Sequence, residues 1–493
     1  MTRTRRVRSL LTVGAALTLP LATAVIGPAA LLSPAAAEPA CQAPSPIEAA
    51  VGVPGEAIGK KTGAGVVEVR YTCRLKHSPQ ALRLATPHRG DAFGSSVARG
   101  YFNNDYYEDV AVGVPGLDVK GHKNAGGVAL FYGSKTGLKF GKLITQASKG
   151  IPGAVSTGAR FGAAVSTEGY GPDKAYVLRI GEPGKKVSGH KKAGGFVDLP
   201  YVRGKLTHAR QVTLASKGIP GSPGTGDQLG AALTGSYAVG APGRTVNKKA
   251  GAGAVLVSYL VPSYKPKPEP ATLLTQASPG IPGTPEAGDH FGASLTEHWV
   301  GVPGESVGSV AGAGVVDRYY GGKWKDNPGF QPIAITAGQH GVPGKVRAGA
   351  HFGASLTELG HYVDDTEWTA DEVLVGAPGD VAGGHARAGS VTAIGLNDPT
   401  PDDDGTFGLN GQYQLLTAAT PVTGAAFGTG LARLDIGIAA IGAPGDHGGR
   451  VGVYETAGQS FDLPLALRAT WKQQAGTPEA ADRFGAALAG LPN

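Results

Sequence analysis

Two short sequence elements recur seven times along this chain of 493 residues, 57 to 75 residues apart. The first is an aromatic–glycine pair, with leucine in one copy: Phe93-Gly94, Phe161-Gly162, Leu229-Gly230, Phe291-Gly292, Phe352-Gly353, Phe427-Gly428 and Phe484-Gly485. The second is Gly-x-Pro-Gly after an apolar run, at residues 52–55, 113–116, 181–184, 240–243, 301–304, 376–379 and 442–445. Self-similarity at this spacing indicates one repeated structural unit rather than several unrelated domains.

Each unit is predicted to contain about four short strands separated by Gly/Pro turns. The 80 glycines and 36 prolines would break helices repeatedly, while 41% hydrophobic and 17% charged residues exclude a disordered chain. Asp109–Gly113 and Val373–Gly376 are apolar enough to be buried inner strands, whereas Val66–Tyr71 alternates like a half-exposed outer strand. Four-stranded units repeated around an axis predict an all-β fold, a seven-bladed β-propeller.

The phase of the repeat, that is, which of the two elements comes first and which comes last in the chain, predicts how the ring closes. The first Gly-x-Pro-Gly has no aromatic–glycine pair before it, and the last pair, Phe484-Gly485, has no Gly-x-Pro-Gly after it. Together these two incomplete ends make up one unit. The C-terminal strand, Phe484–Leu488, is therefore expected to pair with the N-terminal segment Ile47–Gly52.

The N-terminal 37 residues have the composition of a secretory signal peptide. Four arginines precede an apolar stretch, an Ala-x-Ala-type site precedes Glu38, and Pro20 and Pro28 argue against a retained membrane helix. We expect residues 1–37 to be a signal peptide, 38–46 a tail and 47–493 the propeller. Removing the signal peptide takes the formal net charge from +7 to +3, which gives no reason to expect nucleic acid or an anionic membrane as partner.

The chain has two cysteines, Cys41 and Cys73. In an oxidising compartment they are expected to form a disulfide that ties the N-terminal tail to the first blade. Two free thiols are the alternative that the sequence leaves open.

Phe-Gly followed by Gly-x-Pro resembles the FG-GAP repeat, and the chain resembles the propeller headpiece of integrin α subunits. Gln146–Gly153 and Gln276–Gly283 are similar to an integrin linker. The resemblance covers nearly all of residues 44–490 and implies the propeller fold. It says little about function, because such propellers serve in adhesion, in scaffolding and occasionally in catalysis. Nothing here resembles the inserted domain, the leg domains or the membrane anchor of an integrin.

The same resemblance implies a calcium loop at Tyr101–Asp109. In FG-GAP repeats this turn follows the pattern Asp-x-Asn-x-Asp-Gly-x-x-Asp, whose oxygens suit Ca²⁺. Asn103, Asp105 and Asp109 fall on ligand positions, and Tyr107 would offer its carbonyl. The pattern's first Asp is replaced by Tyr101 and its Gly by Tyr106, so a metal-free polar turn is the alternative. Asp364–Asp371 keeps acids without their spacing, and Asp402–Gly405 is read as a solvated hairpin tip.

Three further motifs have a structural explanation at hand. Arg89-Gly90-Asp91 spells an integrin-ligand tripeptide, but Gly-Asp before x-Phe-Gly recurs in other units. Gly304–Gly308 matches the nucleophile-elbow pattern around Ser306, but a Gly-rich turn follows where that motif needs a helix. His122 and His190, with Lys123, Lys191 and Lys192, form either a basic rim on one side of the ring or ordinary solvated loops.

These features predict a secreted binding or adhesion protein, free or held at the cell surface, that recognises an extracellular protein or polysaccharide through its loops. The sequence nominates no catalytic residue, so the protein is predicted not to be an enzyme. We expect a monomer with no membrane span, no nucleic-acid partner and at most one Ca²⁺. An extracellular hydrolase or lyase with its site at the channel, and a structural envelope protein without specific ligand, are the alternatives.

Overall fold

The computed structural model divides the chain into two compact units, Met1–Pro39 and Ala40–Asn493. All described residues belong to the second unit, the subject of everything below. They are 47–72, 79–169, 175–235, 238–257, 270–319, 333–359, 361–364, 367–369, 372–396, 411–435, 437–456, 464–474, 479 and 481–489. The predicted signal peptide, the predicted tail, Cys41, Cys73, Asp371 and Asp402–Gly405 lie outside these residues.

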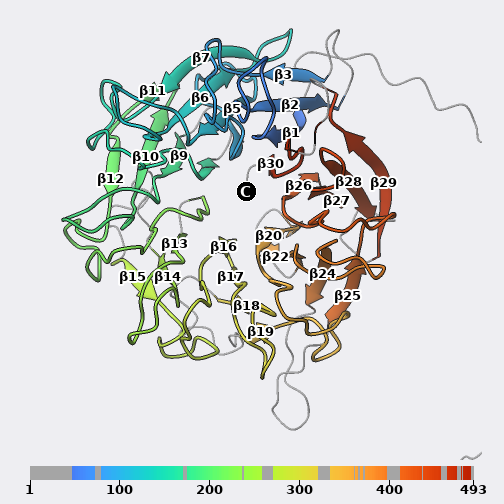
Figure 1. Ribbon diagram of the computed structural model, residues 1–493. Coiled ribbons are helices and arrows are strands. Elements are labelled where there is room, and N and C mark those ends of the chain that lie inside the picture. Colours follow the sequence, from blue (N-terminus) through green and yellow to red (C-terminus); the bar gives the residue numbers. More distant parts are fainter. Residues whose placement is uncertain are drawn as a thin grey trace, which may run out of the picture. The chain divides into compact units, whose positions relative to one another are not determined.

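Seven antiparallel sheets follow one another around a ring, which confirms the predicted seven-bladed β-propeller (Figure 1). None of the described residues is helical, and so no helix among them could span a membrane. Five blades have four strands, one has five, and one shows three within the described residues. Strands are numbered within a blade from the channel outward, as first to fourth.

The strands of the first three blades are as follows. The first blade contains β30 (Ala487–Ala489), β1 (Ile47–Val53), β2 (Val66–Tyr71) and β3 (Gln80–Leu82). The second contains β4 (Val97–Gly100), β5 (Asp109–Val114), β6 (Gly127–Tyr132) and β7 (Lys139–Ile144). The third contains β8 (Val165–Gly169), β9 (Ala175–Gly181), β10 (Phe196–Val202), β11 (Lys205–Leu206) and β12 (Arg210–Val212).

The remaining four blades follow in chain order. The fourth contains β13 (Ala238–Ala241), β14 (Ala254–Val257) and β15 (Thr272–Leu274), and a bridge between Leu233 and Val239 marks its channel side. The fifth contains β16 (Ser294–Leu295), β17 (Trp299–Val302), β18 (Val315–Arg318) and β19 (Ile333–Ile335). The sixth contains β20 (Ser355–Glu358), β23 (Glu372–Ala377), β24 (Ser390–Leu396) and β25 (Gly411–Leu416). The seventh contains β26 (Leu431–Asp435), β27 (Ile438–Ala443), β28 (Arg450–Thr456) and β29 (Leu465–Lys472).

The ring closes as the phase of the repeat predicts. β1 pairs antiparallel with β30, placing Ala50 opposite Ala489 and Gly52 opposite Ala487. The N–H of Gly485 donates to the carbonyl of Gly52 at 3.2 Å. The first blade is therefore built from both ends of the described chain.

The two repeated elements meet inside every blade. The N–H of the glycine in the aromatic–glycine pair donates to the first glycine of Gly-x-Pro-Gly, as from Gly94 to Gly113 and from Gly292 to Gly301, at 3.0 and 3.1 Å. The aromatic side chain itself is fully buried between neighbouring blades, as Phe93 and Phe291 are. The repeat thus encodes the joints of the ring.

The prediction that Val66–Tyr71 is a half-exposed outer strand is wrong. This segment is β2, the third strand of its blade, and all of its residues but Arg70 are buried, including Glu68. Blades of a propeller pack against neighbours on both sides, so middle strands are covered on both faces whatever their alternation. Asp109–Gly113 and Val373–Gly376 belong to second strands, and every one of these residues is buried, as predicted.

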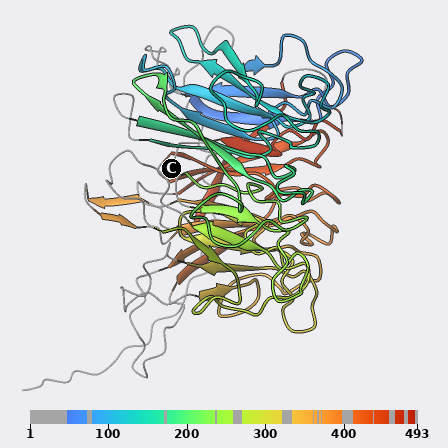
Figure 2. The same ribbon diagram turned by 90° about the vertical axis from the view of Figure 1, so that its left-hand side faces the viewer.

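The ring has two faces, which are distinguished by the turns that they carry. Face A carries the turns from first to second and from third to fourth strands, and face B carries the turns from second to third strands and the linkers between blades. The hairpin of β21 (His361–Asp364) and β22 (Glu367–Thr369) is inserted between β20 and β23, hence on face A. Figure 2 shows this hairpin projecting beyond the sheets.

Candidate functional site: the channel mouth and the tyrosine pocket on face A

The first strands of the blades surround a central cavity of about 230 Å³. Its walls are leucine, valine, alanine and threonine, and two charged side chains, Arg99 and Arg433, reach it from β4 and β26. A space this narrow admits water or a single extended group. Recognition of anything larger therefore takes place at the mouths of the channel rather than inside it.

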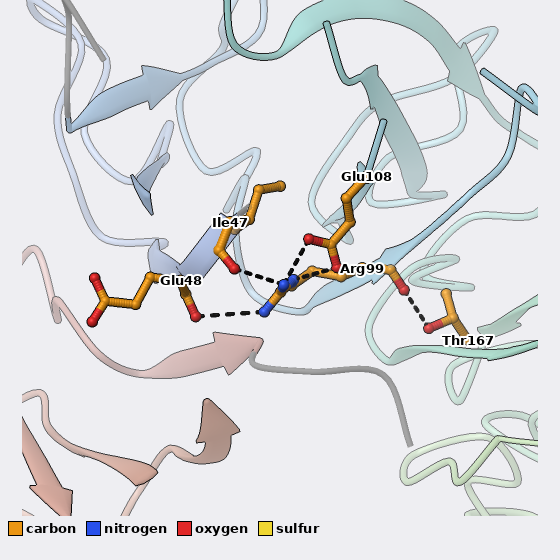
Figure 3. A network of polar contacts seen from close by, with 5 residues as sticks. All are labelled: Ile47, Glu48, Arg99, Glu108 and Thr167. Atoms are coloured by element: carbon orange, nitrogen blue, oxygen red, sulfur yellow. Dashed lines mark hydrogen bonds and ion pairs between the residues drawn. The ribbon is translucent and has the colours of Figure 1, made fainter. Parts of the chain in front are cut away.

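Arg99 joins three blades at the face-A mouth (Figure 3). Its guanidinium forms a bidentate pair with Glu108 at 2.8 and 2.6 Å and donates to the carbonyl of Ile47 at 2.6 Å. The hydroxyl of Thr167, from the third blade, donates to the Arg99 carbonyl at 2.5 Å. Arg99 is only 3% exposed, so its charge is compensated by Glu108 and by carbonyls. This network fixes the position of Glu108 and of the loop that carries it.

The predicted calcium loop, Tyr101–Asp109, is the turn from β4 to β5 and is closed by its own hydrogen bonds. Asp109 accepts from the N–H of Phe102 at 2.6 Å and from the N–H of Gly133 at 2.8 Å. Asp105 accepts from the N–H of Tyr107 at 3.0 Å and from the Asn103 amide at 2.8 Å. Every carboxylate oxygen at the predicted ligand positions already has a donor from the chain.

The innermost carboxyl of this loop is that of Asp109. Asp109 is fully buried, and burial raises its pKa to about 7, against the opposing effect of the two backbone donors. Within the described residues no group of three or more His, Cys, Asp or Glu side chains is arranged to hold a metal ion. The assignment of Asn103, Asp105, Tyr107 and Asp109 as Ca²⁺ ligands stays a prediction.

The raised pKa of Asp109 carries a testable consequence for stability. A carboxyl whose pKa is about 7 when folded and near 4 when unfolded binds more protons in the folded state, so stability falls as pH rises from about 4 to about 7. The slope for one such group is at most about 1.4 kcal/mol per pH unit. Burial raises the pKa of Glu56 and Glu305 to about 7 as well, so their effects have the same sign.

We therefore expect urea denaturation to give a lower free energy of unfolding at pH 8 than at pH 5. The Asp109→Asn variant, which does not titrate, should show a shallower decline over the same range. An unchanged slope in the variant would show that Asp109 is ionised throughout.

The two residues that depart from the calcium pattern line a pocket. Tyr101 and Tyr106, with Tyr107 and Glu108, form one side of a cavity of about 120 Å³. Tyr71 and the β6–β7 turn (Gly133, Ser134, Gly137 and Leu138) form the rest of its lining with Ile47. We call this cavity the tyrosine pocket. It lies between the first and second blades and opens beside the channel mouth.

The walls of the tyrosine pocket are rigid. The Tyr71 hydroxyl donates to Gln80 at 2.6 Å, and the Gln80 amide donates in turn to the Leu138 carbonyl at 2.6 Å. Tyr101 packs edge-on against Tyr176 of the third blade, with ring centroids 5.7 Å apart. Tyr106, by contrast, is 57% exposed. The pocket thus has a fixed wall and one aromatic ring presented to solvent.

Tyr106 is held in a backbone conformation that disfavours a side chain. Its φ is 65°, in the left-handed region where the calcium-loop pattern places glycine. A non-glycine residue in such a conformation carries strain, which lowers stability. The sequence showed the loss of glycine here but gave no reason for the tyrosine.

A second group of polar residues lies at the channel mouth, around the β16–β17 turn. The carboxylate of Glu358 accepts from the Thr296 hydroxyl at 2.5 Å and from the backbone N–H of His298 at 2.9 Å. Burial lowers the pKa of His298, but the hydrogen bond and charge of Glu358 outweigh this and raise the pKa above its ordinary value. Burial raises the pKa of Glu297, and the charges of Glu358 and Glu168 add to the rise. The sequence analysis did not single out this group, because its members come from three blades.

The remaining sequence motifs have structural roles. Asp91, of the Arg-Gly-Asp tripeptide, is 1% exposed and accepts from the N–H of His88 at 2.5 Å. Asp227 and Asp482 accept in the same way, from Gly224 and Glu479. Ser306 lies in a turn and is not followed by a helix. His122 and His190 occupy equivalent turns on face B.

No protein-family model matches the sequence, and no curated protein matches it. Among solved structures, the chain is similar to a candidate 6-phosphogluconolactonase of Bacteroides fragilis, with 10% identity over 91% of this chain and 99% of that one, at a TM-score of 0.40. A protein from Lactobacillus plantarum has 10% identity over 90% and 98%, at a TM-score of 0.42. The NanB sialidase of Streptococcus pneumoniae has 9% identity over 76% of this chain and 60% of that one, at a TM-score of 0.30.

The prediction that this protein is not an enzyme is corrected and is not retained. Two of the similar structures are described as a lactonase and a sialidase, at identities and TM-scores too low to assign an activity to this chain. The prediction was made because no single repeat contains a carboxylate unusual enough to be nominated as a catalytic group. A propeller assembles polar groups from several blades at its channel mouth, as Glu297, His298 and Glu358 show, so that reasoning was unsound.

Proposed function

We propose that this chain is a secreted FG-GAP-type β-propeller that binds a polysaccharide on face A, with one sugar unit seated in the tyrosine pocket. The proposal is supported by the presentation of Tyr106: an exposed aromatic ring, held at a costly φ, at the edge of a cavity with a fixed wall. The composition of residues 1–37 supports secretion, and the repeated motifs support the FG-GAP type.

The chemistry of the pocket suits a sugar. A tyrosine ring offers a flat apolar face and a hydroxyl at its edge, which match the C–H face and the hydroxyl rim of a pyranose. The Glu108 carboxylate and the Ser134 hydroxyl can accept hydrogen bonds from sugar hydroxyls. A cavity of about 120 Å³ has the volume of roughly four water molecules, which suits part of one sugar ring and is too small for a peptide segment.

The Tyr106→Gly variant is expected to bind polysaccharide about tenfold more weakly or not at all, because it removes the exposed ring. Glycine is favoured at this φ, so the variant should keep the melting temperature of the parent protein. Isothermal titration calorimetry against a panel of soluble polysaccharides measures the loss. Tyr106→Phe should retain most of the affinity, since the ring is kept.

Phe140, 54% exposed on the outer strand β7, provides the matched control. Phe140→Ala removes an exposed ring of similar size outside the pocket and should bind like the parent. Binding that is unaffected by Tyr106→Gly, or lost equally in Phe140→Ala, contradicts the assignment of the pocket. A parent protein that binds none of the polysaccharides contradicts the proposed function itself.

A second candidate, polysaccharide hydrolysis at the same face, is favoured by the environment of Glu297. Burial and neighbouring carboxylates raise its pKa, while Glu358 is held by His298 and Thr296. Two carboxyls in contrasting environments at one mouth are the arrangement that acid–base hydrolysis of a glycosidic bond requires. Release of reducing sugar from a bound polysaccharide, abolished in Glu297→Gln, would support this candidate.

A further inference from the structure

The turns on face B between second and third strands are built to one plan in successive blades. In the second, third and fourth blades a two-residue turn is closed by a pair of backbone bonds, between Val119 and His122, Val187 and His190, and Val246 and Lys249. Ile58 and Lys61 form the equivalent bridge in the first blade. Because they connect the same two strands of each blade, these turns lie side by side along one face.

Each turn is fixed to the blade that follows it. The carbonyl of Lys123 accepts from Gly158 at 2.8 Å, and the carbonyl of Asn124 accepts from Arg160 at 3.1 Å. In the next blade the carbonyl of Lys192 accepts from Gln228 at 2.9 Å. The turns are thus held in a continuous arc by backbone bonds, and their side chains remain free to point into solvent.

The arc carries exposed lysines in every one of these four blades. Lys60 and Lys61 occupy the first turn, Lys120 and Lys123 the second, Lys191 and Lys192 the third, and Lys248 and Lys249 the fourth. We call these eight side chains the lysine arc. The only exposed acid on these four turns is Asp118, whose carboxylate accepts from the N–H of Asn124 at 2.9 Å.

Charge on the lysine arc is only weakly compensated: Lys249 acts on the buried carboxyl of Asp289, where it opposes the rise in pKa that burial causes. Among the described residues, no carboxylate forms an ion pair with any of its members, whereas the buried Lys185 and the half-buried Arg244 do pair, with Glu182 and Asp227. The turn of the fifth blade, residues 303–314, has no Lys or Arg, so the arc ends there. A modest overall charge of the propeller thus conceals a strongly cationic segment of one face.

Three of the lysines are held in a conformation that favours glycine. The φ angles of Lys120, Lys192 and Lys248 are 49°, 52° and 66°. At the position of Lys192 the first and fourth blades have Gly63 and Gly251, with φ of 65° and 68°. A side chain there costs roughly 1 kcal/mol relative to a conformation that it prefers. The turn geometry imposes this conformation on other residues too, since Ser188 and Asn124 adopt it at the positions of Lys120 and Lys192.

The composition of the turns indicates the class of ligand. Residues 54–65, 115–126, 182–195 and 242–253 contain no Phe, Tyr or Trp, so the arc offers no ring on which bases could stack. Its charges are ammonium groups on flexible stems, which attract anions without the planar geometry of arginine. We propose that the lysine arc binds an anionic polysaccharide along face B, independently of the tyrosine pocket on face A.

The test uses the purified protein with polygalacturonate and heparin as carboxylated and sulfated probes, and dextran as the uncharged probe. We expect both polyanions to bind, with affinity falling steeply as salt is raised, and dextran not to bind at the arc. The double variant Lys191→Glu/Lys192→Glu should weaken binding of both polyanions by about tenfold. Binding of dextran to the tyrosine pocket is a separate event, which Tyr106→Gly would remove and the lysine variants would leave unchanged.

Two matched variants keep the proposal falsifiable. Lys192→Gly removes one charge while relieving the left-handed conformation, so it should weaken polyanion binding without lowering the melting temperature. Lys135→Glu/Lys205→Glu reverses two exposed lysines near face A, in the β6–β7 turn and at the start of β11, and should leave polyanion binding intact. Equal losses in the two double variants, no polyanion binding, or tighter binding of duplex DNA than of either polysaccharide would overturn the proposal.

Discussion

Replacing Phe484 by alanine is expected to lower the free energy of unfolding by about 3–5 kcal/mol. Phe484 is fully buried and packs with Val51 and Val53 of β1 and with Val451 and Val453 of β28. It therefore fills the seam where the first and seventh blades meet. A loss of this size is a large part of the 5–15 kcal/mol typical of a folded domain.

Phe484→Leu is the matched control, because the fourth blade already has Leu229 at the equivalent, fully buried position. This variant should lose no more than about 1.5 kcal/mol, since it keeps most of the apolar volume. Chemical denaturation followed by circular dichroism measures both values. Similar, small losses in the two variants would mean that the seam adds little to the stability of the ring.

The Gly240→Ala variant is expected to lose about 4 kcal/mol or to fail to fold. A Cβ added at Gly240, in β13, would lie 2.1 Å from the carbonyl oxygen of Gly292 in the next blade. That oxygen belongs to the backbone and cannot move without separating the two blades. Such a clash goes beyond ordinary overpacking, which costs about 1–3 kcal/mol.

Gly395→Ala provides the comparison. Gly395 is also a strand glycine, in β24, but an added Cβ would meet only ordinary contacts, the nearest at 3.7 Å. Alanine should be neutral or slightly stabilising there, because it restricts the unfolded chain. Thermal melting of the two variants separates the steric effect from the general effect of replacing glycine. A Gly240→Ala protein as stable as Gly395→Ala would contradict the close approach of the blades.

The sequence predicted the architecture well because the joints of the ring are backbone contacts that need particular residues. Gly52 and Gly240 must lack side chains where blades approach, and Phe93 or its equivalents must fill the gap between blades, so these residues recur in the sequence. Their order along the chain was enough to predict that β1 pairs with β30. Burial of middle strands such as β2 could not be inferred from alternation, since it depends on packing by neighbouring blades.

The candidate sites were less accessible to sequence analysis. The tyrosine pocket combines Tyr106 with Tyr71 and Leu138, and the lysine arc combines Lys61 with Lys192, each set drawn from separate repeats. A repeated motif reports what the blades have in common, whereas a binding site depends on how individual blades differ. Loss of the calcium pattern at Tyr101 and Tyr106 was visible in the sequence, but only the structure shows that both rings line one cavity.

Closure by β30 also decides when this protein can finish folding. β1 is among the first segments to be synthesised, yet its partner strand in the ring follows every other strand in the chain. During synthesis the channel side of β1 is an unpaired edge that can pair wrongly or aggregate. Contacts this distant in sequence also make folding slow. The chain therefore needs protection of its early segments until its last residues emerge, which makes export in an unfolded state, followed by folding outside, compatible with its topology.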